Sequence, residues 1–161
     1  MSTLDRPRSL AAAVFALVVL TAAVWLVTDS SSRRAGLRSG DQAVQAAQES
    51  VAAILSYRPE TAERDLEAAA GARLTGRFLD DYTQLIRTVV VPNATQRSVT
   101  AAARVPAAAV VSADGEHAVV LAYVDQTMTE GTQAPTQTNS TVRVTMELVD
   151  GRWLISGFEP I

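Results

Sequence analysis

Asp125 and Tyr123 are the two residues whose types and spacing come nearest to those of a catalytic pair. They stand two positions apart in a segment that reads as a β-strand, so both side chains project from the same face. An aspartate can serve as a general base, and a phenol beside it can donate a hydrogen bond to developing charge. Asp125 lies toward the end of the predicted strand, beside the polar segment 129–139. That position favours a solvated carboxylate over a catalytic base.

A second group of carboxylates gathers near the start of a predicted helix and suits binding better than chemistry. The positive end of a helix macrodipole stabilises negative charge in the first turn, so a solvated acidic face is the plain interpretation. Asp80 and Asp81, early in the next predicted helix, have the same explanation. The sharper interpretation is a docking surface for a partner protein. It assigns partner binding to Glu60, Glu63, Asp65 and Glu67.

Residues that hold metals, phosphates or covalent intermediates do not occur in their usual sequence patterns. His117 is the only histidine and there is no cysteine, which leaves too few ligands for a usual zinc site. Gly36 and Gly40 lack the lysine and the preceding strand of a phosphate-binding loop. No serine has a Gly-x-Ser-x-Gly context. We therefore predict no catalytic, metal or cofactor site, and a protein that is not an enzyme.

An uncharged apolar run from Leu10 to Val27 precedes all of these residues. As a helix it would be about 27 Å long, close to the ~30 Å hydrocarbon core of a bilayer. Arginines flank the run on both sides, so charge alone does not fix its orientation. A cleaved signal peptide is the alternative. We predict a protein of the plasma (inner) membrane with a cytoplasmic tail over 1–9, a single transmembrane anchor over 10–28, a linker over 29–38 and an extracytoplasmic domain over 39–161.

Composition narrows the class of protein to which the outer domain belongs. All fourteen basic residues are arginine. Two of them and one of the seventeen acidic residues precede residue 10, so the remainder of the chain has a net charge of −4. Surfaces that bind nucleic acid are basic, and we therefore predict no nucleic-acid partner. The lack of cysteine is compatible with an exported domain that folds without disulfides.

Three segments beyond the anchor have the spacing of amphipathic helices. Ser39–Gln42 has the form of a capping box, and a helix should follow to about residue 56. A second helix should open near Pro59 and end near Ala72, and Thr75 can cap a third. The expected apolar stripes are Val44, Ala47, Val51, Ile54 and Leu55 in the first helix, and Phe78, Tyr82, Leu85, Ile86 and Val89 in the third.

After Pro92 the pattern changes to that of β-strands. Pro106 interrupts the first strand and requires an edge position or a bulge. Asp114–Gly115 and Asp150–Gly151 are hairpin signals, while segment 129–139 reads as a flexible loop. The expected strands are 96–111, 116–127, 140–149 and 152–158, with Val142, Val144, Met146, Leu148, Trp153 and Ile155 facing inward.

Three helices followed by four antiparallel strands predict an α+β domain, with the helices packed on one face of a curved sheet. This element order is that of the nuclear-transport-factor-2-like cone fold. The fold hosts ketosteroid isomerases, in which an aspartate base works inside the cone. Tyr57 and Tyr82 could approach Asp125 from the helices. A cone can also hold a lipid, and small residues such as Ala101 and Ala103 either leave room for one or pack tightly.

Several short segments, taken in order behind the apolar run, resemble the Mce-associated membrane proteins of actinobacteria. No one of these segments is specific, since Asp-Gly-Arg-Trp closes many domains of this fold. Their combination covers nearly the whole chain. The segments are Asp65, Leu74–Phe78, Val110–Ser112, Val124–Gln126, Val142–Met146 and Asp150–Ile155.

The resemblance implies an accessory subunit that stabilises a Mce-type importer of sterols, fatty acids or other lipids. Its partners would be transporter subunits, either the permease or the Mce proteins, together with the lipid bilayer. Two alternatives stay open. One is a carrier module that binds a lipid ligand in the cone, and the other is an anchored structural component of a type IV secretion system.

Overall fold

The computed structural model of the protein describes residues 38–161. The predicted tail over 1–9, the anchor over 10–28 and all but the last residue of the linker over 29–38 lie outside the described residues. Between Arg38 and the C-terminus, no helix is both long enough and apolar enough to cross a membrane.

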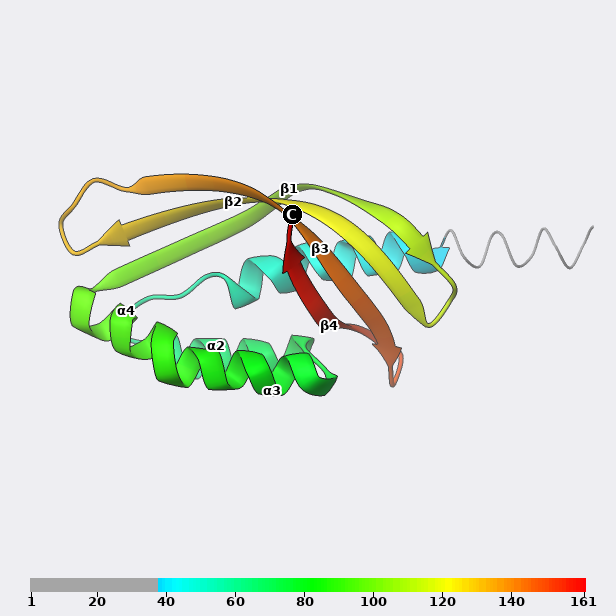
Figure 1. The fold of residues 1–161 in the computed structure, drawn as a ribbon, viewed down its shortest axis with the longest axis horizontal. Helices are drawn as coiled ribbons and strands as arrows, with labels where there is room; N and C mark the ends of the chain where they lie inside the picture. Colours follow the sequence, from blue (N-terminus) through cyan, green and yellow to red (C-terminus); the bar gives the residue numbers. More distant parts are fainter. Residues whose placement is uncertain (1–37) are drawn as a thin grey trace, which may run out of the picture. The chain divides into compact units, whose positions relative to one another are not determined.

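Helices pack against one side of a four-stranded antiparallel sheet, which confirms the predicted α+β class (Figure 1). The first helix covers residues 38–54, the second is α2, and the third helical arm joins α3, one π-turn and α4. The bounds are α2 (Ala62–Arg73), α3 (Gly76–Leu85), η1 (Ile86–Val90), α4 (Val91–Arg97), β1 (Val99–Ala113), β2 (His117–Glu130), β3 (Thr136–Val149) and β4 (Arg152–Pro160).

The first helix buries the stripe that its sequence predicted. Ala47 and Val51 are fully buried and Ile54 nearly so. Its predicted start is wrong, because Arg38 is already helical and Ser39 therefore lies within the helix instead of capping it. Gly40 is buried against β1, where a Cβ added to it would lie at an ordinary contact distance of 3.5 Å from the Val110 side chain.

The third helical arm runs further than predicted. Pro92 was expected to end helical structure and Gln96 to begin a strand, yet α4 continues to Arg97. The π-turn immediately before α4 changes the backbone hydrogen-bond pattern, and Pro92 then stands in the first turn of α4, where a missing N–H is tolerated. Ser98, with φ of 52°, reverses the chain into β1.

The strands follow one another in the order β1-β2-β3-β4, so β1 and β4 are the sheet edges. Pro106 lies at a break in register between Arg104 and Ala107 of β1, which confirms the expectation of an edge strand with a bulge. The turn at Asp150–Gly151 has positive φ at both residues, as the hairpin signal predicted.

The hairpin between β2 and β3 differs from the prediction. Segment 129–139 was expected to be a loop, but β2 continues to Glu130 and β3 begins at Thr136. The residues of β3 before Val142 are mostly exposed, so this end of the ribbon has no burial pattern that would reveal a strand. Polar composition there reflects solvent on both faces instead of a lack of regular structure.

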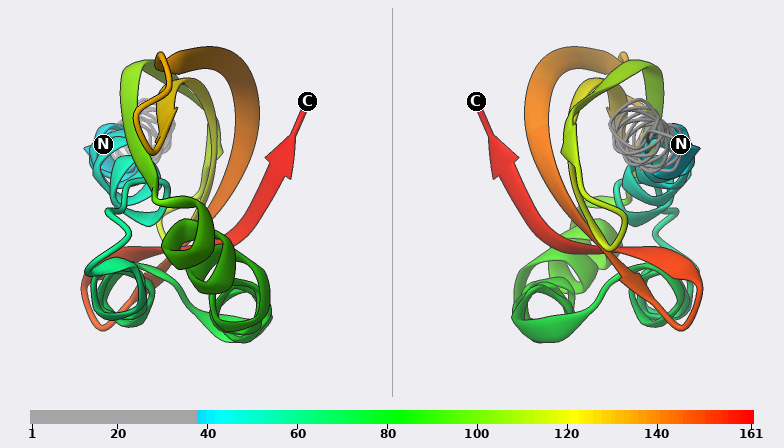
Figure 2. Two further views of the ribbon diagram at one scale, coloured as in Figure 1. Left: turned by 90° about the vertical axis from the view of Figure 1, so that its left-hand side faces the viewer. Right: turned by 90° about the vertical axis from the view of Figure 1, so that its right-hand side faces the viewer.

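The core lies between the sheet and the helices. Val142, Val144, Met146 and Ile155 are buried as predicted, while Leu148, near the end of β3, is half-exposed. Trp153 is also buried, and the Phe158 ring stacks on Phe78 of α3 with centroids 6.3 Å apart. Figure 2 shows the sheet curving, with α2 and α3 side by side below its β4 end.

Candidate functional site

The four predicted partner-binding carboxylates do not form one surface. Glu60 precedes α2, whereas Glu63, Asp65 and Glu67 belong to it. Glu63 and Glu67 are four residues apart and share a helix face, but Asp65 is two residues from each and projects from the other side. The helix therefore divides the predicted acidic face between three neighbouring hollows.

Glu67 lies in the largest of these hollows, a groove of about 520 Å³ between α2 and the third helical arm. We call it the α2–α3 groove. Glu67 and Gly71 line it from α2, and i, i+4 steps along the other arm supply Leu79, Thr83 and Arg87. The full lining is Glu67, Gly71, Leu79, Asp80, Thr83, Gln84, Arg87 and Thr88.

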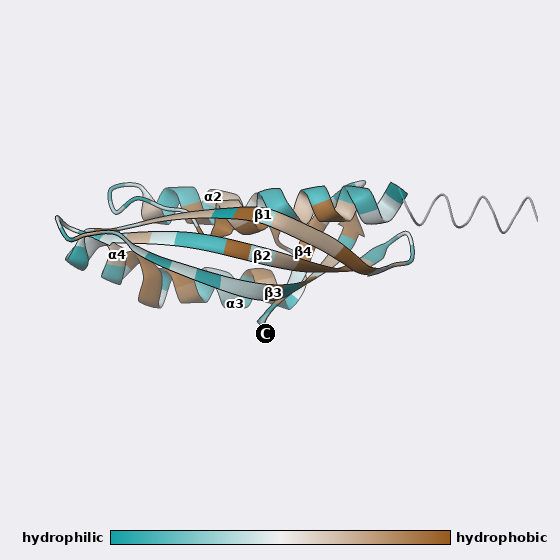
Figure 3. Cartoon of the chain, turned by 90° about the horizontal axis from the view of Figure 1, so that it is seen from above, coloured by the Kyte–Doolittle hydropathy of each residue, from teal (hydrophilic) through white to brown (hydrophobic). Residues whose placement is uncertain are grey.

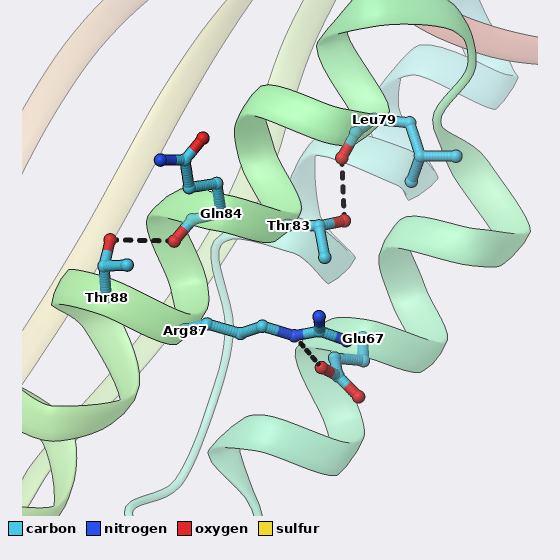
Figure 4. Close-up of polar contacts among 6 residues, drawn as sticks. All are labelled: Glu67, Leu79, Thr83, Gln84, Arg87 and Thr88. Atoms are coloured by element: carbon cyan, nitrogen blue, oxygen red, sulfur yellow. Dashed lines mark hydrogen bonds and ion pairs between the residues drawn. The ribbon is translucent and has the colours of Figure 1, made fainter.

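An ion pair closes one part of this groove. The Nε of Arg87 donates to Oε1 of Glu67 at 2.6 Å, and both side chains are partly exposed (Figure 4). Pairs exposed in this way contribute only about 0–1 kcal/mol to stability. The pair neutralises the charge of Glu67, so Glu67 is less available to a basic partner than the sequence suggested, and within residues 38–161 Asp80 is left as the unpaired carboxylate of the groove.

The hydroxyl groups along the groove are already bonded within their own helix. Thr83 donates to the carbonyl of Leu79 at 2.7 Å and Thr88 to that of Gln84 at 2.8 Å (Figure 4). A Cβ added at Gly71 would meet nothing within 4 Å, so the groove is open beside α2. This arrangement suits packing against another polypeptide better than holding a reacting group.

The remaining predicted carboxylates occupy the other two hollows. Glu60 and Glu63 line one of about 370 Å³ beside Val91 and Thr95 of α4. Asp65 lines another of about 450 Å³, which faces the start of β1. Hydrogen bonds from Thr61 and then Arg64 lower the pKa of Asp65, so this carboxylate stays ionised.

The geometry of Asp125 does not assemble a catalytic set. Asp125 and Tyr123 share the face of β2 that points away from the helices, because Val124 and Ala122 between and beside them are buried. Tyr82 lies on the opposite side, where its hydroxyl donates to the carbonyl of Ile54. Tyr57 pairs with Ala101 of β1, whose side chain is buried on that same inner side, so neither tyrosine approaches Asp125 in the way that the sequence predicted.

His117 begins β2 and is exposed, close to the Asp114 carboxylate. The backbone N–H groups of His117 and Glu116 both donate to that carboxylate, which lowers the pKa of Asp114. These hydrogen bonds fix the shape of the turn between β1 and β2. Across residues 38–161, no three histidine, cysteine or acidic side chains gather in a way that could hold a metal ion.

Comparison with known sequences shows the family to which this chain belongs. Outer membrane protein Rv1973 of Mycobacterium tuberculosis is 54% identical over 120 residues, which are 74% of each chain. The chain belongs to the Rv1973 family. A second M. tuberculosis protein of this family, Rv1362c, is 41% identical over 135 residues, which are 83% of this chain and 58% of Rv1362c. No protein-family model matches the chain.

Solved structures show the fold of this Rv1973-family protein. An IcmL-like type IV secretion system protein from Legionella pneumophila has a TM-score of 0.63 at 12% identity, covering 75% of this chain and 92% of that one. The periplasmic domain of DotI has a TM-score of 0.62 at 18% identity, covering 73% and 91%. The fold is the nuclear-transport-factor-2-like cone that the element order predicted. The protein is thus a cell-envelope protein with a cone domain.

Sequence reasoning missed the residues that complete the α2–α3 groove of this Rv1973-family member. Arg87 lies 20 residues beyond Glu67 and comes beside it only when the two helical arms pack. The sequence indicated only that Gly71 weakens the end of its helix, and gave no sign that it lines a groove. The i, i+4 spacing of Leu79, Thr83 and Arg87 was the one available indication of a continuous face.

Proposed function

We propose that this protein is a membrane-anchored, non-enzymatic accessory subunit that stabilises a Mce-type lipid import complex. The α2–α3 groove carries the proposal, because it is an open surface whose threonine hydroxyls and Glu67–Arg87 pair are internally bonded, while the carboxylate of Asp80 stays available to a partner polypeptide. Glu60 and Glu63 line a separate hollow beside α4, which we propose as a second contact for the same partner because Glu63 shares its helix face with Glu67. The partners are transporter subunits, either the permease or the Mce proteins.

The proposed anchor over 10–28 explains how a weak surface can suffice. When two proteins are anchored in the same membrane, contact between their outer domains becomes nearly intramolecular. The effective concentration is then roughly millimolar for short linkers. The anchor is proposed to lie in the plasma membrane, with the cone domain on the extracytoplasmic side. Separation of inner and outer membranes by density, followed by immunodetection of the protein, tests this location.

The close packing on the inner face of the sheet favours the docking function over a lipid-carrier function. Ala101 is buried, and Ala103 and Ala108 pack against the core, so these small residues serve close packing. A carrier would need space where those side chains and the first helix now meet. A second candidate function, an anchored structural component of a type IV secretion system, is favoured by the fold shared with the IcmL-like protein and DotI.

The test is affinity purification of the full-length protein from its native membrane in mild detergent, with mass spectrometry of proteins and lipids. Gly71→Arg should fill the groove without disturbing α2, because a side chain there meets open space. Ala68→Arg is the matched control, since Ala68 is exposed on the same helix and does not line the groove.

The proposal expects transporter subunits to accompany the wild-type and Ala68→Arg proteins in a defined ratio, and to be lost from Gly71→Arg. Secretion-system subunits in their place would favour the second candidate. Bound lipid without protein partners would favour the carrier. Equal recovery of transporter subunits by both variants would remove the α2–α3 groove from the mechanism.

A further inference from the structure

A second groove crosses the sheet on the face that the helices leave free. It has a volume of about 410 Å³, and we call it the outer-sheet groove. Three consecutive residues from each of β1, β2 and β3 line it: Ala102–Arg104, Asp125–Thr127 and Gln137–Asn139. In Figure 3, which looks onto this side of the sheet, hydrophilic stretches of β1 and β2 lie next to each other.

The strand register determines which residues form the floor and the walls of this groove. The middle row, Ala103, Gln126 and Thr138, directs its side chains inward, as shown by the bond from Gln126 Nε2 to the Leu55 carbonyl. The backbone of that row is therefore the floor. The walls are two rows of outward side chains: Ala102, Thr127 and Gln137 on one side, and Arg104, Asp125 and Asn139 on the other.

The charged wall, formed by Arg104, Asp125 and Asn139, has no net charge, and both oxygens of its carboxylate already accept hydrogen bonds. Arg104 donates through Nε to Oδ2 of Asp125 at 3.0 Å, and its terminal nitrogen Nη2 forms an ion pair with the same oxygen at 2.9 Å. The amide of Asn139 donates to the other oxygen, Oδ1. The guanidinium is thus already paired with a carboxylate. The two charges cancel, so the groove carries no net charge to attract an ion of either sign.

Uncharged hydrogen-bonding groups remain free to meet a ligand. Thr127 offers a hydroxyl, Gln137 an amide with both donors and an acceptor, and Asn139 the oxygen of its amide. Tyr123 stands in the next row of the same face, just beyond the charged wall, and its side chain is 41% exposed. An exposed aromatic ring beside a neutral polar groove offers one apolar surface and one polar surface to the same molecule.

We infer that the outer-sheet groove binds a neutral oligosaccharide. Sugar hydroxyls donate and accept at once, so they match mixed amide and hydroxyl walls, while the C–H face of a pyranose ring packs on Tyr123. The inference is independent of the proposed docking function, because the α2–α3 groove lies on the helices at the other side of the sheet.

Binding is to be measured by saturation-transfer NMR and calorimetry on the full-length protein, held in a detergent without a sugar headgroup. The probes are three neutral oligosaccharides, maltoheptaose, mannohexaose and a galactohexaose, with inorganic phosphate as the charged comparison. Gln137→Ala removes a wall amide and Tyr123→Ala removes the ring. Gln133→Ala is the matched control, since Gln133 is exposed in the adjoining β2–β3 turn and does not line the groove.

The inference expects at least one oligosaccharide to bind with a Kd of about 10 mM or lower, and phosphate not to compete. Gln137→Ala and Tyr123→Ala should each weaken binding by roughly 3- to 10-fold, as loss of one neutral hydrogen bond or one aromatic contact would. Gln133→Ala should bind as wild type. Failure of all three sugars to bind, competition by phosphate, or equal effects of Gln137→Ala and Gln133→Ala would each overturn it.

Discussion

Tyr82→Phe is the substitution whose effect on stability the structure defines best. The Tyr82 hydroxyl donates to the carbonyl of Ile54, at the end of the first helix. That carbonyl belongs to the last turn of the helix, where no backbone N–H further along the chain takes it in the regular pattern. One phenol therefore connects the third helical arm to the first helix and satisfies a helix end at the same time.

The expected cost follows from the hydrogen bond and its setting. A typical intramolecular hydrogen bond contributes about 0.5–1.5 kcal/mol, and a partner left unsatisfied in a buried place costs about 1–3 kcal/mol. Ile54 is 3% exposed, so its carbonyl lies in a place with little access to water. We expect Tyr82→Phe to lower the free energy of unfolding by about 1–2 kcal/mol, or roughly 3–6 °C in Tm for a domain of this size.

Urea and thermal unfolding of the full-length protein in detergent, followed by circular dichroism, measure this change. Tyr123→Phe is the matched control, because Tyr123 is exposed on the outer face of β2 and lies away from the helices. It should change the free energy of unfolding by less than about 0.5 kcal/mol. Equal effects of the two substitutions would refute the inter-helix bond as a source of stability.

The same phenol predicts a dependence on alkaline pH. Burial, with the neighbouring Tyr57, raises the pKa of Tyr82 above 10.0. The unfolded chain then releases the proton at lower pH than the folded one, so the stability that Tyr82 confers is complete below pH about 10 and falls as the pH rises above it. Tyr82→Phe should flatten that decline, and an unchanged slope between the two proteins would contradict the assignment.

Three further predictions concern two glycines and an acidic turn. Gly71→Ala should stabilise the protein by about 0.5–1 kcal/mol, because α2 is helical there and the added methyl meets nothing. Gly157→Ala should destabilise it by about 1–3 kcal/mol, since the new Cβ would lie 3.2–3.3 Å from Thr145; urea unfolding of both variants decides. The lowered pKa of Asp114 means that its contribution is present above the ordinary aspartate range and is lost as the pH falls through its folded pKa. Asp114→Asn should therefore flatten the acid side of the stability profile, and an unchanged acid slope would count against the turn geometry.

Periodicity predicted those elements in which one face is buried. The stripe of Ala47, Val51 and Ile54 and the alternation of Val142, Val144 and Met146 both follow directly from burial on one side. The start of β3 at Thr136 could not be found in this way, because its first residues are exposed and carry no alternation. Pro92 misled for a different reason, since a π-turn before it lets the helical arm continue.

The two grooves show why a site is harder to predict than the elements that carry it. Each depends on residues from separate segments, and their meeting is set by packing or by strand register. Glu67 was singled out from the sequence, but its partner Arg87 comes from another helix. Asp125 was recognised as chemically interesting, while Asn139 had been placed in a loop, so their pairing across β2 and β3 could not be foreseen.

The division of the sheet into two faces constrains what the cone domain can do. Its inner face is committed to packing, since Val120, Val124 and Val144 are buried there against the helices. A buried reaction chamber would require smaller side chains in that core, and truncating a buried residue such as Met146 or Ile155 to alanine costs about 2–5 kcal/mol. Both proposed recognition sites therefore lie on surfaces that folding leaves free, the outward sides of α2 and the third helical arm and the outer face of β1–β3. Contacts of this kind are shallow, which is why the proposed docking function relies on the proposed anchor to hold the domain beside a partner.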